Sequence, residues 1–310
     1  DHRRRGATVD PDRVVLTAST SEAYTWLFKL LCDPGDAVLI PRPSYPLFDH
    51  LTALEGVATV PYDLAYHGRW EIDVPALERA PDTVRAVVVV SPNNPTGSFV
   101  DRDTLLTLRG LCTSRGWALV VDEVFADYLL DVTDPETDLA LDDSVLTFTL
   151  GGLSKTVGLP QVKLGWMVVG GPAADRQAAL TRLELIADSF LSVSTPVQVA
   201  AADLLERGAV VRAHIQQRLA ENLRVLRARC AERPSCEVLR TEGGWSAVVR
   251  VPAIRSEEQL VVDLVETQHV IVHPGFFFDF VHEAFVVVSL LPALADFDAG
   301  ITRVLDHAAV

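Results

Sequence analysis

Short apolar runs rich in β-branched residues recur through the first half of the chain and alternate with amphipathic stretches. This alternation is typical of βαβ units with parallel strands. Several runs are apolar at every position, as expected for strands that are covered on both faces. We predict strands at 14–17, 37–40, 57–60, 86–90, 117–121, 145–149 and 164–169, and helices at 20–32, 45–55, 101–115 and 173–190.

The pattern changes near residue 195. The stretch 196–233 is rich in Arg, Glu, Ala and Leu and predicts one long helix. Short strands are expected after it at 236–240, 245–251, 269–273 and 284–290. We therefore predict an α/β fold with a large domain at 1–195, built on a mainly parallel sheet, and a connecting helix with a smaller α+β domain at 196–310. A chain of 310 residues with 49% hydrophobic residues can bury cores of this size.

The charge of the chain argues against two classes of partner. The net charge is -15 and the basic residues are scattered, so we expect neither nucleic acid nor an anionic membrane surface as a partner. No stretch approaches the roughly 20 apolar residues of a membrane span. The four cysteines show no C-x-x-C spacing, which favours reduced thiols and a cytoplasmic location. The chain opens on Asp1 in what resembles a helix end, so we expect that an N-terminal segment is missing.

Polar or glycine-rich segments follow four of the predicted strands. They are ASTSE at 18–22, SPNNPTG at 91–97, DE at 122–123 and GGLSK at 151–155. In an open parallel sheet the carboxyl ends of the strands share one rim, and ligands bind beyond that rim. The sequence therefore predicts a ligand site built from these four segments.

Each candidate residue of this rim has an ordinary structural explanation beside the functional one. Backbone N–H groups and hydroxyls at a helix start can bind an anion, but Ser19 with Glu22 also fits a capping box. Asp122 follows a buried strand and needs a proton donor or a cation, unless it only caps a helix. Asn94 fits a turn, and Tyr45 fits an aromatic residue that fills the core edge at a helix start.

Lysine is rare in this chain. Only Lys29, Lys155 and Lys163 are lysines among the 27 basic residues. Arginine keeps its proton at any working pH, whereas a buried lysine amine can become neutral and attack a carbonyl. Lys155 is therefore predicted to be a nucleophilic amine, unless codon usage explains the arginine bias. A phosphate-loop nucleotide hydrolase does not fit, because the pattern G-x-x-x-x-G-K-[ST] needs glycines where Thr149 and Ser154 stand.

Five segments, in order along the chain, resemble the fold-type-I pyridoxal-phosphate enzymes, specifically the class I/II aminotransferases. The segments are VLTASTSEAY at 15–24, PRPSYP at 41–46, PNNPTG at 92–97, VDEVFADY at 121–128 and SKTVGLPQVKLGW at 154–166. The resemblance implies pyridoxal 5'-phosphate as the cofactor and the transfer of an amino group between an amino donor and a keto acid. It also implies a homodimer.

The resemblance further implies a role for each matching residue. Lys155 is similar to the lysine that forms the Schiff base with the cofactor and later moves a proton between substrate and cofactor. Asp122 corresponds to the partner of the ring nitrogen, Asn94 to the residue that bonds the ring hydroxyl, and Tyr45 to the aromatic residue that stacks on the ring. The residues implied to hold the cofactor phosphate are Ser19, Thr20, Ser154 and Lys163.

The sequence departs from the family pattern at four positions. Phe125 stands where the family usually has a tyrosine, Gly152 where a serine often occurs, and Lys163 where an arginine is more common. Val287 stands where an arginine clamps the substrate α-carboxylate through a bidentate pair. Either another arginine, such as Arg250, holds this carboxylate, or the substrate is not an ordinary α-amino acid.

Alternatives to transamination stay open. A β-eliminating lyase, or another chemistry at the α-carbon, can use the same cofactor site, because that site does not decide which bond breaks. A non-catalytic module that keeps the fold for cofactor sensing or partner binding is favoured by the lost clamp and opposed by the retention of Lys155, Asp122 and Asn94. No metal site is expected, because His269 and His273 lack a third ligand.

Overall fold

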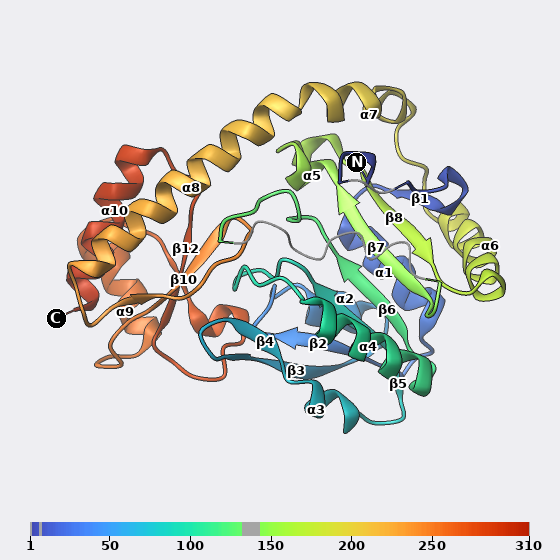
Figure 1. Ribbon diagram of the computed structural model, residues 1–310, viewed down its shortest axis with the longest axis horizontal. Coiled ribbons are helices and arrows are strands. Elements are labelled where there is room, and N and C mark those ends of the chain that lie inside the picture. Colours follow the sequence, from blue (N-terminus) through green and yellow to red (C-terminus); the bar gives the residue numbers. More distant parts are fainter. Residues whose placement is uncertain (1, 6–7, 132–142, 310) are drawn as a thin grey trace.

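The computed structural model describes residues 2–5, 8–131 and 143–309, and it contains two β-sheets connected by long helices (Figure 1). The larger sheet has eight strands in the order β1-β8-β7-β6-β5-β2-β3-β4. Its strands are β1 (Val14–Thr17), β2 (Ala37–Arg42), β3 (Ala58–Tyr66), β4 (Trp70–Ile72), β5 (Val84–Val90), β6 (Ala118–Asp122), β7 (Thr147–Gly152) and β8 (Gly165–Gly170). The predicted α/β fold with a mainly parallel sheet is confirmed.

The direction of each strand decides which strand ends meet. The neighbours β3, β2, β5, β6 and β7 run parallel to one another. β8 is antiparallel to both β7 and β1, and β4 forms a hairpin with β3. Because two reversals restore the direction, β1 runs the same way as β7. The carboxyl ends of β1, β5, β6 and β7 therefore share one rim, as the sequence predicted.

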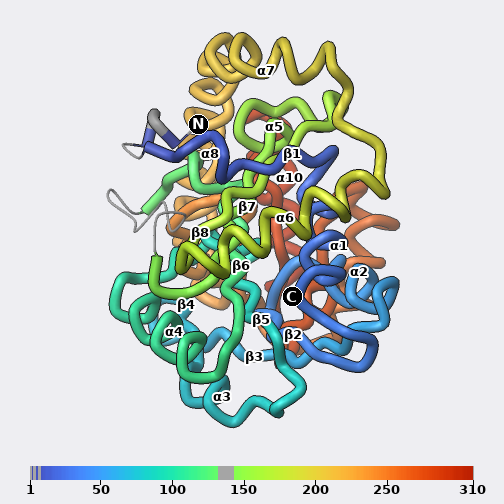
Figure 2. Tube along the Cα trace, turned by 90° about the vertical axis from the view of Figure 1, so that its right-hand side faces the viewer, coloured from blue at the N-terminus to red at the C-terminus, as the bar shows by residue number. Residues whose placement is uncertain are grey.

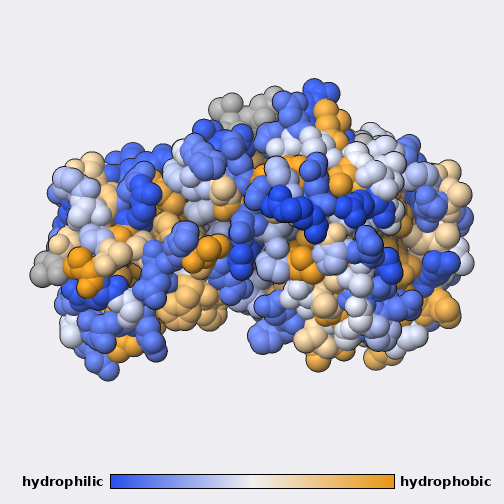
Figure 3. All heavy atoms as spheres, turned by 90° about the horizontal axis from the view of Figure 1, so that it is seen from below, coloured by the Kyte–Doolittle hydropathy of each residue, from blue (hydrophilic) through white to orange (hydrophobic). Residues whose placement is uncertain are grey.

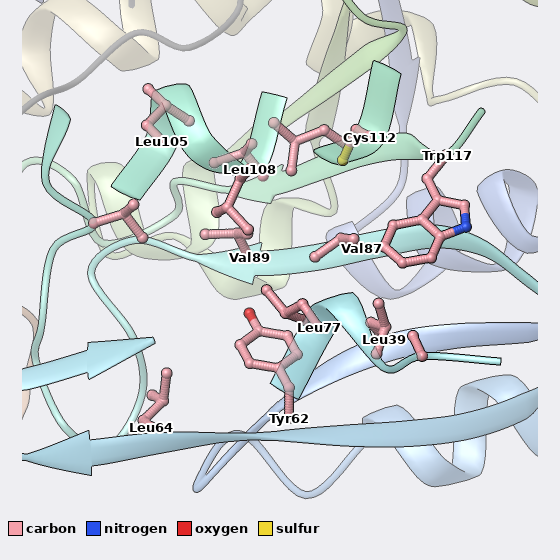
Figure 4. Close-up of a cluster of buried hydrophobic side chains, with 14 of the residues drawn as sticks. Leu39, Tyr62, Leu64, Leu77, Val87, Val89, Leu105, Leu108, Cys112 and Trp117 are labelled. Atoms are coloured by element: carbon pink, nitrogen blue, oxygen red, sulfur yellow. The ribbon is translucent and has the colours of Figure 1, made fainter. Parts of the chain in front are cut away.

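Helices cover both faces of the large sheet, and the central strands β5, β6 and β7 are buried at nearly every position (Figure 2). One face carries α1 (Thr20–Leu31), α2 (Phe48–Leu54) and α6 (Ala173–Ser189), and the other carries α3 (Val74–Glu78) and α4 (Arg102–Arg115). Along β5, Val87 and Val89 face α3 and α4 (Figure 4), whereas Val88 and Val90 face the opposite layer. Burying each of these side chains contributes about 1.5–3 kcal/mol, which holds the rim residues on a rigid support.

A four-stranded antiparallel sheet, in the order β11-β12-β10-β9, forms the core of a smaller lobe. Its strands are β9 (Glu237–Val238), β10 (Ser246–Arg250), β11 (His273–Pro274) and β12 (Phe285–Ser289). The helices after the large sheet are α7 (Thr195–Arg207), α8 (Ala209–Ala231), α9 (Glu257–Asp263) and α10 (Leu294–Ala308). Leu223 of α8 and Ile301 of α10 belong to the core cluster on one face of this sheet. Seen from below, the surface narrows between the two lobes (Figure 3).

The long helix predicted at 196–233 is present as α7 and α8, although their boundary at Gly208 was not predicted. The helical hydrogen bonds continue through this boundary, because the N–H of Gly208 donates to the oxygen of Leu204 and the N–H of Arg212 donates to that of Gly208, both at 2.9 Å. A β-carbon at Gly208 would lie 2.4 Å from Cγ1 of Val157, so only glycine lets the helix junction approach the turn that follows Lys155. The sequence also did not predict β4, α3 and α10. The division of the chain at residue 195 stays a prediction.

The strand predicted at 269–273, with a histidine at each end, is shorter than expected. β11 covers only two residues, and His269 instead ends the preceding helical turn with a left-handed φ of 56°. In the described ranges, no three His, Cys, Asp or Glu side chains gather in a group that could hold a metal ion. None of the described helices has the length and the apolar character needed to cross a bilayer.

Candidate active site

The predicted rim contains a cavity of about 140 Å³. Five of the predicted site residues line it: Thr20, Tyr45, Asn94, Asp122 and Lys155. Most of the other lining residues are apolar or aromatic, and they include Leu47, Phe48, Leu51, Val90, Val124 and Phe125. A larger hollow of about 550 Å³ lies at the opposite end of the sheet, beside Trp117 at the start of β6, and contains none of the predicted residues. The smaller cavity is therefore the candidate site.

Lys155 enters the cavity from a short helical turn, α5 (Leu153–Thr156), that directly follows β7. Burial lowers the pKa of its amine, and the negative charge of Asp122 opposes this shift. The hydroxyl of the fully buried Tyr128 donates to the backbone oxygen of Lys155 at 2.6 Å and fixes this turn. A lowered pKa leaves more of the amine neutral at a given pH, which is the form that attacks a carbonyl.

Asp122 is the last residue of β6 and only 7% exposed. Burial raises the pKa of its carboxyl group to about 6, although two hydrogen bonds and the charge of Lys155 act in the opposite direction. Oδ1 accepts from the backbone N–H of Val124 at 3.1 Å, and Oδ2 accepts from the hydroxyl of Tyr24 at 2.9 Å. Within the described part of the chain this carboxylate forms no ion pair. It therefore fits a cationic group placed in the cavity.

The sequence analysis did not identify Tyr24. This residue lies in α1 and is 4% exposed, and its ring also lines the cavity. A signal for it was present, because Tyr24 follows Thr20 by four residues and so lies on the same face of the helix. Its bond to Asp122 could not be predicted, because the two residues are 98 positions apart in the sequence.

Ser19 caps α1, and Glu22 reaches back to the residue before the cap and not to the cap itself. Ser19 Oγ accepts from the N–H of Glu22 at 3.1 Å, and Glu22 Oε2 accepts from the N–H of Ala18 at 2.6 Å. The structural explanation for Ser19 is thus confirmed. Thr20, the next residue, lines the cavity. A phosphate-binding role for the two hydroxyls stays a prediction.

Ser154 and Lys163 are not among the residues that line the cavity. Ser154 directly precedes Lys155 in α5 and is half-buried. Lys163 is exposed and has a left-handed φ of 59°, two residues before β8 begins. The first residue of β8, Gly165, pairs with the last residues of both β1 and β7, so Lys163 lies at the same rim.

Asn94 and Tyr45 reach the cavity from two loops that are tied together. Asn93 is buried, and its side-chain amide donates to the backbone oxygen of Pro43 at 3.1 Å and accepts from the hydroxyl of Ser44 at 3.1 Å. Tyr45 is 47% exposed and lines the cavity, so it does not fill the core edge as the structural alternative expected. Asn93 therefore has the structural role, and it positions both neighbouring loops.

Arg250, the alternative partner for a substrate carboxylate, and Val287, at the position of the family's arginine, both lie outside the cavity lining. Arg250 lies at the exposed end of β10 and forms an ion pair with Glu237 of β9. It is not among the residues that line the cavity. Val287 in β12 is 2% exposed and packs in the same core cluster as Val248 and Phe278.

Comparisons with known proteins agree with this geometry. The sequence profile of the aminotransferase class I and II family matches residues 2–296. The alanine aminotransferase of Mycobacterium tuberculosis (strain ATCC 25618 / H37Rv) is 28% identical over 301 residues, covering 95% of this chain and 70% of that protein. The glutamate-pyruvate aminotransferase AlaA of Haemophilus influenzae is 25% identical over 96% of this chain and 75% of its own length.

Solved structures show the same fold. The alanine aminotransferase from Pyrococcus furiosus superimposes with a TM-score of 0.87 at 25% identity, over 98% of this chain and 78% of that one. The aspartate aminotransferase from Thermotoga maritima superimposes with a TM-score of 0.85 at 22% identity, over the same shares of the two chains. Enzymes of this class and fold use pyridoxal phosphate. The rim, the buried carboxylate and the family profile together place this chain in the family of class I and II aminotransferases.

Proposed function

We propose that Lys155 is the catalytic lysine of this aminotransferase and that Asp122 is the partner of the cofactor ring nitrogen. The observation that supports this most directly is the cavity in which a half-buried amine of lowered pKa lies close to a buried carboxylate without an ion-pair partner among the described residues. Pyridoxal phosphate, when bound, supplies an aldehyde that reacts with amines and a protonated ring that withdraws electrons from the amine-bearing carbon. An ionised Asp122 keeps that ring nitrogen protonated.

The remaining rim residues would orient the cofactor. Asn94 has a side-chain amide that can donate to the ring hydroxyl, and the exposed ring of Tyr45 is free to stack on the ring face. The residues proposed to hold the phosphate are Ser19, Thr20, Ser154 and Lys163. Hydroxyl groups, the start of α1 and one lysine are suitable partners for a doubly charged anion.

The proton transfer is assigned to Nζ of Lys155. In its neutral form this amine would accept the proton from the amine-bearing carbon of the substrate and, as an ammonium group, would be the acid that returns it. Phe125 and Trp245 flank the amine and limit the access of water to it. Membership of the aminotransferase family favours transamination over elimination, and a nucleophilic amine beside a buried carboxylate favours catalysis over a non-catalytic module.

Borohydride reduction with peptide mapping tests this assignment. After incubation with pyridoxal phosphate and borohydride, the covalent label should lie on Lys155, and a visible absorbance band should precede reduction. Lys155→Ala should lose both signals, whereas Lys29→Ala should keep them, because Lys29 pairs with Glu55 away from the cavity. A label on another lysine, or no label at saturating cofactor, would contradict the proposal.

We also propose a homodimer in the cytoplasm. Large apolar side chains are exposed along the connection from α6 to α7, including Leu185 at 72%, Leu191 at 93% and Val199 at 80%. Exposed apolar residues of this extent are typical of interfaces between chains. The four cysteines are all unpaired thiols, which suits a reducing compartment. Analytical ultracentrifugation should give twice the chain mass, and Val199→Asp should shift the protein toward a monomer.

A further inference from the structure

Two aromatic rings from different lobes face the amine of Lys155. Nζ lies 5.4 Å from the ring centroid of Phe125 and 5.0 Å from that of Trp245. Phe125 follows β6 of the large sheet, and Trp245 directly precedes β10 of the small sheet. The two rings contact each other edge to face at 5.5 Å. We call this pair the aromatic wall, and a substrate carbon bonded to nitrogen beside Lys155 lies within its reach.

The segment 241–245, here called the strap, fixes Trp245 through backbone bonds to two loops of the large lobe. The N–H of Gly243 donates to the oxygen of Gly97 at 2.9 Å, and the N–H of Gly244 donates to the oxygen of Tyr128 at 2.9 Å. A β-carbon at Gly97 would lie 2.5 Å from the oxygen of Gly243, so the two backbones are in direct contact. The ring of Tyr128 packs edge to face on Trp245 at 5.3 Å. Contacts with the large lobe therefore fix the position of Trp245 in the aromatic wall.

The arginines that reach the segments carrying the wall are each paired with a buried acid. Arg5 forms an ion pair with Glu123 at 2.7 Å, and the side chain of Glu123 is 2% exposed. Arg69 and Arg240 share Glu242 at 3.5 Å and 3.1 Å, and the side chain of Glu242 is 4% exposed. Removing an arginine from a buried carboxylate is strongly unfavourable. These arginines therefore stabilise the fold and are not available to pair with a substrate.

The cavity beside the aromatic wall offers no second cation, because Lys155 is the only cation among the described residues that line it. Val287 belongs to the core cluster that extends into the large lobe, whereas Val286 and Val288 face α8 and α10. Phe125 and Trp245 pack in the same cluster as Val286 and Val288, so Val287 lies on the other face of the small sheet. A substrate carboxylate in the cavity would have no described cation other than Lys155 to pair with. Burial of an unpaired carboxylate is costly, and burial of an apolar group in the same place is favourable.

Resting on the proposed aminotransferase function, we propose that the amino donor is a primary amine that has no carboxylate on its amine-bearing carbon and packs an apolar substituent on the aromatic wall. The amine-bearing carbon of the donor is oxidised to a carbonyl. The cofactor would take up the two electrons and the nitrogen of the donor, so that its aldehyde would become an aminomethyl group. One water is released when the amine condenses and one is consumed when the carbonyl product is freed, so no net water is consumed. The proton that leaves the donor carbon is carried by Lys155.

Two matched pairs of donors test this substrate class on the cofactor-loaded protein. 1-Phenylethylamine and phenylglycine differ only in a methyl group against a carboxylate, and isopropylamine and alanine differ in the same way. In single-turnover absorbance measurements each amine should react at least about 100-fold faster than its amino acid. Trp245→Leu should slow 1-phenylethylamine about 10-fold or more and isopropylamine much less. An amino acid that reacts as fast as its matched amine would overturn the proposal.

A binding measurement without turnover separates this inference from the proposed function. In protein whose cofactor has been fixed to Lys155 by borohydride, equilibrium dialysis should show acetophenone binding at least about 10-fold more tightly than phenylglyoxylate. Failure to fix the cofactor on Lys155 contradicts the proposed function. Successful fixation followed by equal binding of the two ketones contradicts the substrate class alone.

Discussion

The hydrogen bond from Tyr24 to Asp122 should control how cofactor binding depends on pH. Tyr24→Phe removes only the hydroxyl that donates to Oδ2 of Asp122 at 2.9 Å. A buried hydrogen bond to a charged group contributes about 1.5–3 kcal/mol, and 1.36 kcal/mol corresponds to about one pKa unit. Loss of this bond should therefore raise the pKa of Asp122 by about 1–2 units. From a starting value of about 6 it would reach about 7–8.

The direction of the effect follows from the role proposed for Asp122, which requires the ionised carboxylate. At pH 7 the wild-type carboxylate is mostly ionised in the cofactor-free protein, whereas in Tyr24→Phe a large share stays protonated. Cofactor affinity in the variant should therefore fall several-fold at pH 7 and recover near pH 9. Absorbance titrations with pyridoxal phosphate at a series of pH values from 6 to 9 would measure the midpoint in each protein.

Tyr62→Phe provides a matched control. Tyr62 is 2% exposed, and its hydroxyl donates to the backbone oxygen of Val88 at 2.8 Å, so this change also removes one buried hydrogen bond. It should lower the stability of the fold without moving the midpoint of cofactor binding. An unchanged midpoint in Tyr24→Phe, or an equal shift in Tyr62→Phe, would show that the bond from Tyr24 does not set the pH dependence of cofactor binding.

Three further changes test the structure around the site. Burial raises the pKa of Asp122 to about 6 from an ordinary 3.8 in the cofactor-free protein, so its contribution to stability is full below about pH 4 and is lost as the pH rises through about 6. The free energy of unfolding of Asp122→Asn, measured with urea relative to wild type, should therefore rise by about 3 kcal/mol from pH 4 to pH 7. A difference between the two proteins that does not change with pH would contradict this. Gly97→Ala should destabilise the protein by about 2 kcal/mol more than Gly68→Ala. Both glycines have positive φ, but only a β-carbon at Gly97 would meet a backbone oxygen. Equal losses of stability in thermal unfolding would exclude that contact as the cause. Glu242→Gln should lower the stability by about 1–3 kcal/mol in the same assay, because it weakens the ion pairs with two arginines and the hydrogen bond from the N–H of Phe99. Unchanged stability would show that these contacts of Glu242 do not stabilise the fold.

The rim could be predicted from the sequence because it depends on local patterns. The apolar runs of β5, β6 and β7 mark buried strands, and the polar residues directly after them must lie at the strand ends. Asp122 and Lys155 were identified for that reason. The antiparallel β8 was not predicted as such, because an apolar run does not carry the direction of its strand.

The partners of these residues could not be predicted from the sequence, because they come from distant segments. Tyr24 reaches Asp122 from a helix, and its position within an apolar stretch is equally typical of a core aromatic residue. Trp245 reaches Lys155 from the smaller lobe, and no local pattern states how two lobes pack. The need for glycine at position 208 depends on the close approach of Val157, which is a tertiary contact.

The strap has a consequence for the order in which the site is completed during synthesis. Lys155 and the rim leave the ribosome first, and Trp245 follows about 90 residues later. At the usual rate of translation this delay lasts about 5–20 s. During that interval the nascent large lobe has its amine and Phe125 without the covering indole. The cofactor pocket is thus finished by the last third of the chain, and a ribosome that stalls before residue 241 would display an open, reactive lysine.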